Sequence, residues 1–236
     1  HSAGSDWIRA GAGVLAQTAG FSTMMARGGL LLPPADGEEI EHFLQDLYAV
    51  EDDEFILQTR QQDRGAHPVG LLKAARPSLL VMKEVRYHYL IETLLQQLEG
   101  IKVIGIVRNP CGAVNSWLKT PREFKPEWNA AAEWRNAQAK NQGRREEYYG
   151  FEKWKELARL FLRLEKDRPD AFYLLRYETL VIHTEAETAK LFAFCGLDFP
   201  PQVQAFLSAS HAREVEDPDT VFRTSDVAER WKSELD

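Results

Sequence analysis

One short stretch of the sequence constrains the fold more than any other. Residues 102–107 (Lys-Val-Ile-Gly-Ile-Val) form an apolar run rich in β-branched side chains, which predicts a strand buried on both faces of a parallel sheet. Arg108 stands where this strand should end. Asn109 and Pro110 then predict the start of a helix, because proline lacks the N–H group that would have no partner in a first helical turn.

Ser116 follows Arg108 after about two helical turns. A cation at the carboxyl end of a strand and a hydroxyl on the next helix converge on the edge where open α/β sheets bind ligands, and the pair suits an anion. The alternative is an ordinary strand–turn–helix with a surface arginine, because α/β domains contain many such junctions.

Two further apolar runs, 78–82 and 171–175, predict core strands before and after this one in the chain. A strand, a helix and a strand over 78–107 form the right-handed unit of a parallel sheet. The amphipathic segments that predict helices are 38–50, 89–98, 151–166 and 185–195. We expect one α/β domain over residues 1–236, with a short parallel sheet flanked by helices on both faces.

Composition limits the possible partners. The chain has 236 residues, 44% of them hydrophobic, which is enough for one full core. A formal net charge of −7 argues against nucleic acid or an anionic membrane as the main partner. No apolar run approaches the length needed to span a bilayer. Cys111 and Cys195 are too few for a disulfide framework and lack metal-ligand spacing, so we expect no metal site and a reduced, cytoplasmic compartment.

The motif R-N-P-x-x-x-x-x-S, from Arg108 to Ser116, resembles the 3′-phosphate-binding motif of sulfotransferases that use 3′-phosphoadenosine 5′-phosphosulfate (PAPS). This resemblance implies that Arg108 and Ser116 hold the ribose 3′-phosphate of the donor, on a nucleotide-binding fold of the P-loop type. Four other stretches resemble segments of the same family and follow in the family's order.

The first stretch is similar to the family's 5′-phosphosulfate loop, commonly K/R-S-G-T-T-W. The resemblance implies that small residues let the amides of a helix start approach the donor, with Trp7 near the adenine. Ser2 departs from the pattern, because it stands where relatives carry the basic residue that neutralises the leaving phosphate. The strand that leads into this loop in relatives is absent from the sequence. The residues of this expected donor loop are Ser2, Ala3, Gly4, Ser5, Asp6 and Trp7.

The second stretch, 83–86 (Lys-Glu-Val-Arg), resembles the K-x-V-R segment of carbohydrate sulfotransferases. Ionisable groups directly after a core strand are costly unless they pair with each other or with a ligand. Transfer to a hydroxyl needs a base for its proton and a cation for the developing charge. We expect Glu84, or else His88, to be the base. Lys83 would replace the cation missing from the first loop, and Arg86 would orient the donor or an acidic acceptor. The alternative is a set of ion pairs in solvent.

Two later stretches complete the resemblance. Arg176-Tyr177-Glu178 is similar to the R-Y-E-D-L segment that closes a core strand in relatives. This implies that Tyr177 lies near the nucleotide, while Arg176 and Glu178 brace the sheet edge. Residues 221–232 resemble the family's late loop, which implies that Arg223 is a second cation on the 3′-phosphate.

Between these stretches, Trp128 and Trp134 suggest a surface that stacks on a sugar acceptor, with hydrogen bonds from Arg135, Asn136 and Asn141. The alternative is that aromatic residues at helical spacing belong to the core.

We therefore expect a sulfotransferase that takes PAPS as donor, releases 3′-phosphoadenosine 5′-phosphate (PAP), needs no metal and acts on a hydroxyl-bearing acceptor, with a carbohydrate favoured. A catalytically impaired nucleotide-binding relative is the main alternative, because Ser2 lacks the family's charge. A P-loop kinase is disfavoured, since the chain has no G-K-[ST] lysine. A structural interaction domain would leave the arginines at the strand ends unexplained. If an N-terminal anchor precedes the sequence, a Golgi-lumenal catalytic domain replaces the cytoplasmic enzyme.

Overall fold

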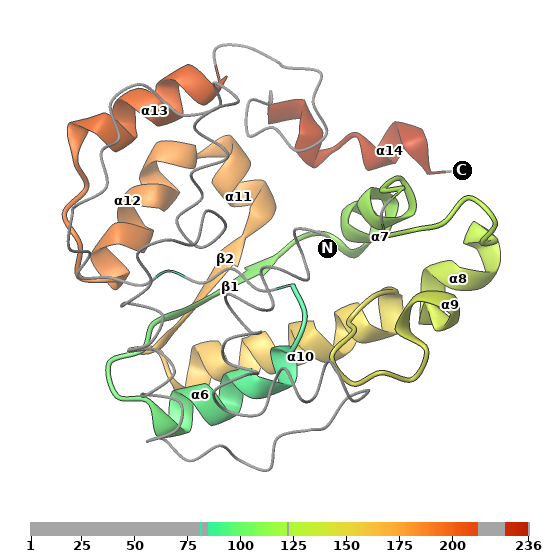
Figure 1. The fold of residues 1–236 in the computed structure, drawn as a ribbon. Coiled ribbons are helices and arrows are strands. Elements are labelled where there is room, and N and C mark those ends of the chain that lie inside the picture. The colour runs from blue at the N-terminus through green and yellow to red at the C-terminus, as the bar shows by residue number, and fades with distance from the viewer. Residues whose placement is uncertain (1–80, 82–84, 122, 212–224, 236) are drawn as a thin grey trace, which may run out of the picture. The chain divides into compact units, whose positions relative to one another are not determined.

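The computed structural model describes residues 81, 85–121, 123–211 and 225–235 (Figure 1). The chain forms two compact units, residues 1–101 with 144–146 and residues 102–143 with 147–236. Some expected features lie outside the described residues: the helix at 38–50, most of the strand at 78–82, the donor loop at 2–7, Lys83, Glu84 and Arg223.

The described part of the first unit is a single 3-10 turn that leads into a helix. η1 (His88–Leu90) runs directly into α6 (Ile91–Gln97). Gly100, just after the helix, has a φ of +74°, which glycine adopts without strain. The helix predicted over 89–98 and ended by this glycine is therefore confirmed. Its buried side chains are Leu90, Leu95 and Leu98.

The second unit is built on two parallel strands. β1 (Val103–Val107) pairs with β2 (Phe172–Arg176), with Val107 opposite Arg176 at the carboxyl edge. Both strands lie within one residue of their predicted bounds. Parallel strands need a long crossover, and here the chain supplies helices between them.

Helices cover both faces of this sheet (Figure 1). α10 (Phe151–Asp167) lies on one face, where the rings of Phe161 and Phe172 are 5.3 Å apart. α11 (Tyr177–Ile182) and α12 (Thr184–Phe194) lie on the other, where Phe194 contacts Tyr173. The predicted α/β arrangement is confirmed. The other helices of this unit are α7 (Pro110–Leu118), α8 (Ala130–Asn136), α9 (Gln138–Asn141), α13 (Pro201–His211), η2 (Ser225–Ala228) and α14 (Trp231–Glu234).

β1 is buried on one face only. A Cβ atom on Gly105 would overlap the Phe172 ring of β2 and lie 2.9 Å from the Phe161 ring of α10, so the packing of these two rings requires glycine here. On the opposite face, Ile104 and Ile106 are 38% and 57% exposed. The prediction of a strand buried on both faces is wrong, because α12 packs over Tyr173 of β2 and leaves β1 less covered. Among the described residues, no helix is both long and apolar enough to cross a membrane.

Candidate functional site

The strand-to-helix turn after β1 forms as the sequence predicts. Asn109 caps α7, and its side-chain oxygen accepts a hydrogen bond from the Cys111 N–H at 3.0 Å. Pro110 occupies the first helical position. A first helical turn leaves its N–H groups without helical partners. Here Asn109 accepts from one of them, and Pro110 has no N–H group at all. The turn therefore fixes the point from which the Arg108 side chain leaves the backbone.

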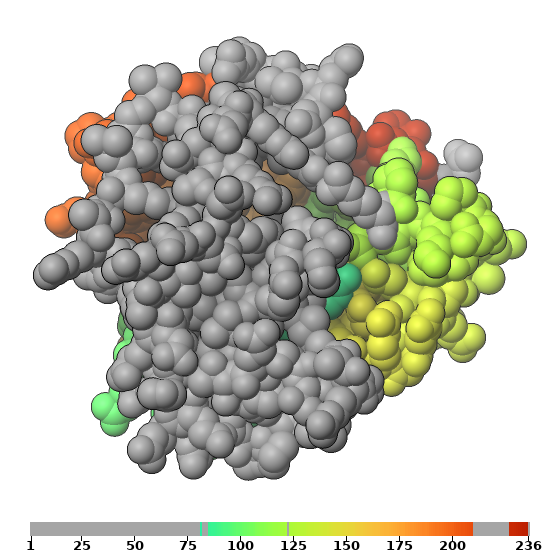
Figure 2. All heavy atoms as spheres, viewed as in Figure 1, coloured from blue at the N-terminus to red at the C-terminus, as the bar shows by residue number. Residues whose placement is uncertain are grey.

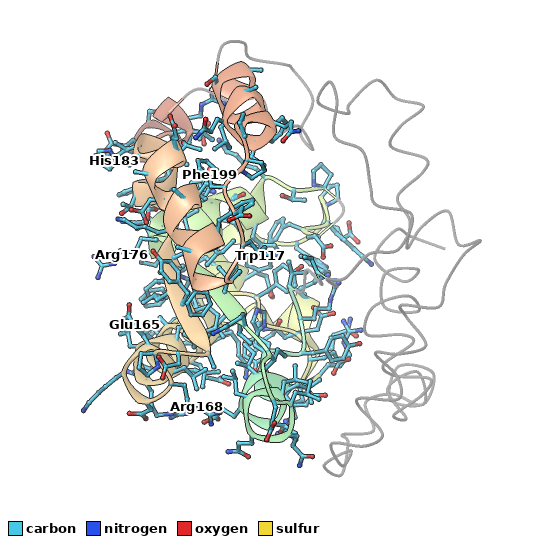
Figure 3. The ribbon with its side chains drawn as sticks, turned by 90° about the vertical axis from the view of Figure 1, so that its left-hand side faces the viewer. Trp117, Glu165, Arg168, Arg176, His183 and Phe199 are labelled. Atoms are coloured by element: carbon cyan, nitrogen blue, oxygen red, sulfur yellow. The ribbon has the colours of Figure 1, made fainter. Side chains whose placement is uncertain are left out.

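The strand register places the residues after β1 beside those after β2. Because Val107 pairs with Arg176, the next residues of each strand meet at the same edge. The Arg108 guanidinium lies over the Tyr177 ring, with its central carbon 4.6 Å from the ring centroid. Glu178 Oε1 accepts a hydrogen bond from the Asn109 N–H at 2.8 Å, so it braces this edge as expected. Arg176 is exposed and points away from the fold (Figure 3).

The half-buried Arg108 guanidinium is held in place, but not all of its N–H groups have a hydrogen-bond acceptor in the described part of the chain. Its Nη2 donates to the Val227 carbonyl in η2 at 3.1 Å. Its Nε is buried and has no hydrogen-bond partner in the described part of the chain. A Cβ atom on Gly112 would lie 2.9 Å from Nε and 3.2 Å from Trp231 Cδ1. Glycine at this position therefore lets the guanidinium and the Trp231 ring pack closely on α7, while the buried Nε–H still needs an acceptor.

The C-terminal segment, which consists of η2 and α14 (residues 225–235), packs against the side of α7 that carries Gly112. Asn115 Nδ2 donates to Glu234 Oε2 at 2.7 Å, and Lys119 forms an ion pair with the same carboxylate at 3.0 Å. The hydrogen bonds from Asn115 and Lys119 lower the pKa of Glu234 below its ordinary value. Figure 2 shows the red atoms of this segment lying against the green atoms of α7.

Ser116 lies one helical turn after Gly112, so both residues share one side of α7. Its side chain is exposed, and its carbonyl oxygen accepts a hydrogen bond from Thr120 Oγ1 at 2.7 Å. The structure therefore gathers Arg108, Tyr177 and Gly112, with Ser116 next along the helix.

Two candidate residues of the acceptor side, Arg86 and His88, belong to the first unit. Arg86 is half-exposed in a bend just before η1. Burial lowers the pKa of His88 to about 4, so its imidazole is neutral near neutral pH. A neutral imidazole can accept a proton, but at this pKa it is no stronger a base than an ordinary carboxylate.

The two candidate tryptophans belong to different aromatic clusters. Trp128 packs edge-on against Phe124 in a small core that also contains Trp117. Trp134 lies on α8, is 41% exposed, and has its ring 5.9 Å from that of Phe151. The structure does not gather them into one surface.

Two of the polar neighbours proposed for the same surface have internal partners. Asn141 is buried, and its amide makes three hydrogen bonds to backbone atoms of Asn136 and Tyr149. Arg135 forms an ion pair with Glu152 at 3.0 Å. The expectation that Asn141 hydrogen-bonds a sugar is wrong, because its donors and acceptor are used within the fold.

Sequence reasoning missed two residues that shape the surroundings of Arg108. Trp154 lies in the amphipathic segment 151–166, whose pattern indicates no polar partner, but its indole N–H donates to the Arg108 carbonyl at 3.0 Å. Gly112 was not singled out, although a glycine inside a helix is a signal, because it costs about 1 kcal/mol relative to alanine. Among the described residues, no group of three or more His, Cys, Asp or Glu side chains could hold a metal ion.

A model of the sulfotransferase family matches residues 19–201, which is most of the chain. The chain belongs to the sulfotransferase family. Its helix-rich α/β fold with a short parallel sheet agrees with this membership. Comparisons with curated proteins and with solved structures gave no match. As a sulfotransferase, the protein transfers a sulfuryl group to a hydroxyl acceptor. The matched residues include Arg108, Ser116 and Tyr177, whereas the donor loop at 2–7 and the C-terminal segment lie outside them.

Proposed function

We propose that this sulfotransferase uses PAPS as its donor and that Arg108 is the main contact of the donor's 3′-phosphate. The observation that carries the proposal is the buried Nε of Arg108, which has no acceptor in the described part of the chain and belongs to a guanidinium packed closely against Gly112. A guanidinium suits a doubly charged phosphate, because its N–H groups match the phosphate oxygens in pairs. The Tyr177 ring packs against the guanidinium, with 4.6 Å between the ring centroid and Arg108 Cζ.

Three other groups would contribute to the donor site. Ser116 shares the side of α7 that carries Gly112, so its hydroxyl would supply a further hydrogen bond. Support for Arg223 as a second cation comes from Val227, four residues later, whose carbonyl accepts from Arg108. The backbone amides of residues 2–7 would bind the phosphosulfate end, and Tyr177 would lie near the nucleotide.

The donor supplies a sulfuryl group already attached to a good leaving phosphate, so the protein contributes mainly position and charge. We assign the base that takes the acceptor's proton to Glu84, with His88 second. The lowered pKa of His88 supports this order, because it removes the usual advantage of histidine near neutral pH. Lys83 would stabilise charge on the leaving phosphate, and Arg86 would orient the donor or an acidic acceptor.

For the acceptor we propose a carbohydrate. Trp134 supports this choice, because its exposed ring lies beside that of Phe151 and offers a face for stacking. Trp128 is the weaker candidate, because its ring already packs against Phe124.

The test compares two arginines that each follow or end a strand of the same sheet. Titration calorimetry with PAP should show roughly 100-fold weaker binding for Arg108→Ala, because charged hydrogen bonds to the phosphate are lost. Arg176→Ala is the matched control, because this exposed side chain has no partner in the described part of the chain, and its affinity should equal that of the wild type.

Unchanged PAP affinity in Arg108→Ala would remove the donor site. Tight PAP binding by the wild type without turnover on any hydroxyl acceptor would indicate a catalytically impaired relative. Binding of ATP with magnesium, and not of PAP, would indicate a kinase.

A further inference from the structure

We propose that Trp154 and Glu178 are positioning residues that clamp the peptide group between Arg108 and Asn109, and thereby aim the Arg108 guanidinium. The inference rests on the proposed function, because it assigns to two residues outside the donor contacts a role in recognising the 3′-phosphate. Both residues act through Arg108.

The first half of the clamp comes from α10. The indole Nε1 of Trp154 donates to the carbonyl oxygen of Arg108 at 3.0 Å, across 46 positions of sequence. The indole itself is held, because its ring stacks on Phe151 at 6.1 Å with only 5° between the ring planes. A rigid aromatic donor therefore fixes the carbonyl end of the peptide group.

The second half comes from α11. Glu178 Oε1 accepts a hydrogen bond from the Asn109 N–H at 2.8 Å. This N–H precedes the first residue of α7 and takes no part in the helix. A bond between a carboxylate and a backbone N–H is charge-assisted, and such bonds are about twice as strong as neutral ones.

The two bonds act on a single rigid unit. The Arg108 carbonyl and the Asn109 N–H belong to one planar peptide group, so fixing both atoms fixes its orientation. That orientation sets the backbone torsions on each side, ψ of Arg108 and φ of Asn109. A rotation of this peptide plane would move the Arg108 guanidinium away from the Tyr177 ring and from Gly112.

The end of β2 therefore supports Arg108 at two points. Tyr177 lies under the guanidinium, and the next residue, Glu178, holds the backbone that carries it. Trp154 completes the arrangement from the opposite face of the sheet, since α10 and α11 cover different faces (Figure 1). Holding a ligand-binding group in place from neighbouring residues is how proteins preorganise charged sites.

The test measures affinity for PAP and for AMP, which lacks the 3′-phosphate. Trp154→Phe keeps an aromatic ring but removes the N–H, and should weaken PAP binding about tenfold while leaving AMP binding unchanged. Trp117→Phe is the matched control, because it removes an indole N–H that donates to Glu123 at 3.3 Å and not to Arg108. Its affinity for PAP should match the wild type.

Glu178 provides an independent pair of variants. Glu178→Ala should also weaken PAP binding selectively, whereas Glu178→Gln should restore most of the affinity, because its amide oxygen can still accept from the Asn109 N–H. In an Arg108→Ala background, adding Trp154→Phe should weaken PAP binding no further, since the clamp acts through the arginine.

Three results overturn the clamp: PAP affinity in Trp154→Phe and Glu178→Ala equal to that of Trp117→Phe, equal losses for PAP and AMP, or a full further loss in the Arg108→Ala background. These differ from failure of the proposed function, in which Arg108→Ala by itself leaves PAP affinity intact. Should Trp154→Phe fail to fold, the two Glu178 variants decide the matter.

Discussion

A single methyl group added at Gly112 should separate donor binding from stability. In Gly112→Ala the new Cβ atom would lie 2.9 Å from Arg108 Nε, 3.2 Å from Trp231 Cδ1 and 3.5 Å from Arg108 Cζ. Carbon and nitrogen atoms without a hydrogen bond do not approach to 2.9 Å, so the guanidinium must move. This movement strains its hydrogen bond to the Val227 carbonyl and its packing over the Tyr177 ring.

The two effects of this substitution have opposite signs. Replacing a helical glycine by alanine stabilises a helix by about 0.5–1 kcal/mol, which offsets the cost of moving the guanidinium. We therefore expect the free energy of unfolding to stay within about 1 kcal/mol of the wild type. Donor binding loses one charged hydrogen bond from the displaced guanidinium, worth about 1.5–3 kcal/mol, which is roughly a 10- to 150-fold rise in the Kd for PAP.

Calorimetric titration with PAP and urea unfolding of the same preparations measure both quantities, and AMP serves as the control ligand. Gly112→Ser should weaken PAP binding at least as much, because it places a larger side chain at the same position. If Gly112→Ala binds PAP as tightly as the wild type, the position of the Arg108 guanidinium against Gly112 does not matter for binding the phosphate. If PAP and AMP affinities fall together, the substitution has disturbed the nucleotide site in general.

Two further substitutions test the packing inside each of the two units. Asn141→Ala removes three part-buried hydrogen bonds and leaves backbone groups of Asn136 and Tyr149 without these partners, so urea unfolding should show a loss of roughly 2–4 kcal/mol with little change in PAP affinity. A loss no larger than that of an exposed asparagine would contradict the assigned role. For His88, the folded pKa of about 4 lies below the ordinary histidine pKa of 6.5, so the unfolded chain binds the proton more tightly. Unfolding free energy should therefore fall as pH drops from about 6.5 towards 4, and His88→Gln should lack this fall; equal pH profiles would refute the assigned burial.

The parts of the fold that follow from local sequence agree with the structure. The β-branched run before Arg108, the proline after Asn109 and the apolar stripe of α10 each act within a few residues, so their strand, helix start and amphipathic helix could be predicted. The brace by Glu178 could also be expected, because parallel strands in register bring their following residues together.

The surroundings of Arg108 could not be predicted in the same way. Trp154 lies 46 positions away and Val227 lies 119 positions away, and no periodicity within either segment indicates a backbone or guanidinium partner. The prediction that Asn141 binds a sugar was wrong for a related reason. An asparagine near exposed aromatic residues has the same sequence pattern whether it binds a sugar or closes a loop. Only the fold decides which of the two it does.

Some of the distant contacts of Arg108 come from residues beyond the part of the chain that the family model matches. The matched residues end at 201, yet the Arg108 guanidinium donates to Val227, and Trp231 lies beside Gly112. The ion pair and hydrogen bond of Glu234 hold the same segment on α7. The C-terminal segment therefore forms one wall of the proposed 3′-phosphate site, although the family match does not include it. Since Arg108 would otherwise have Tyr177 as its main support, the segment's contribution is to hold Nη2, while Nε keeps its hydrogen bond for the proposed donor.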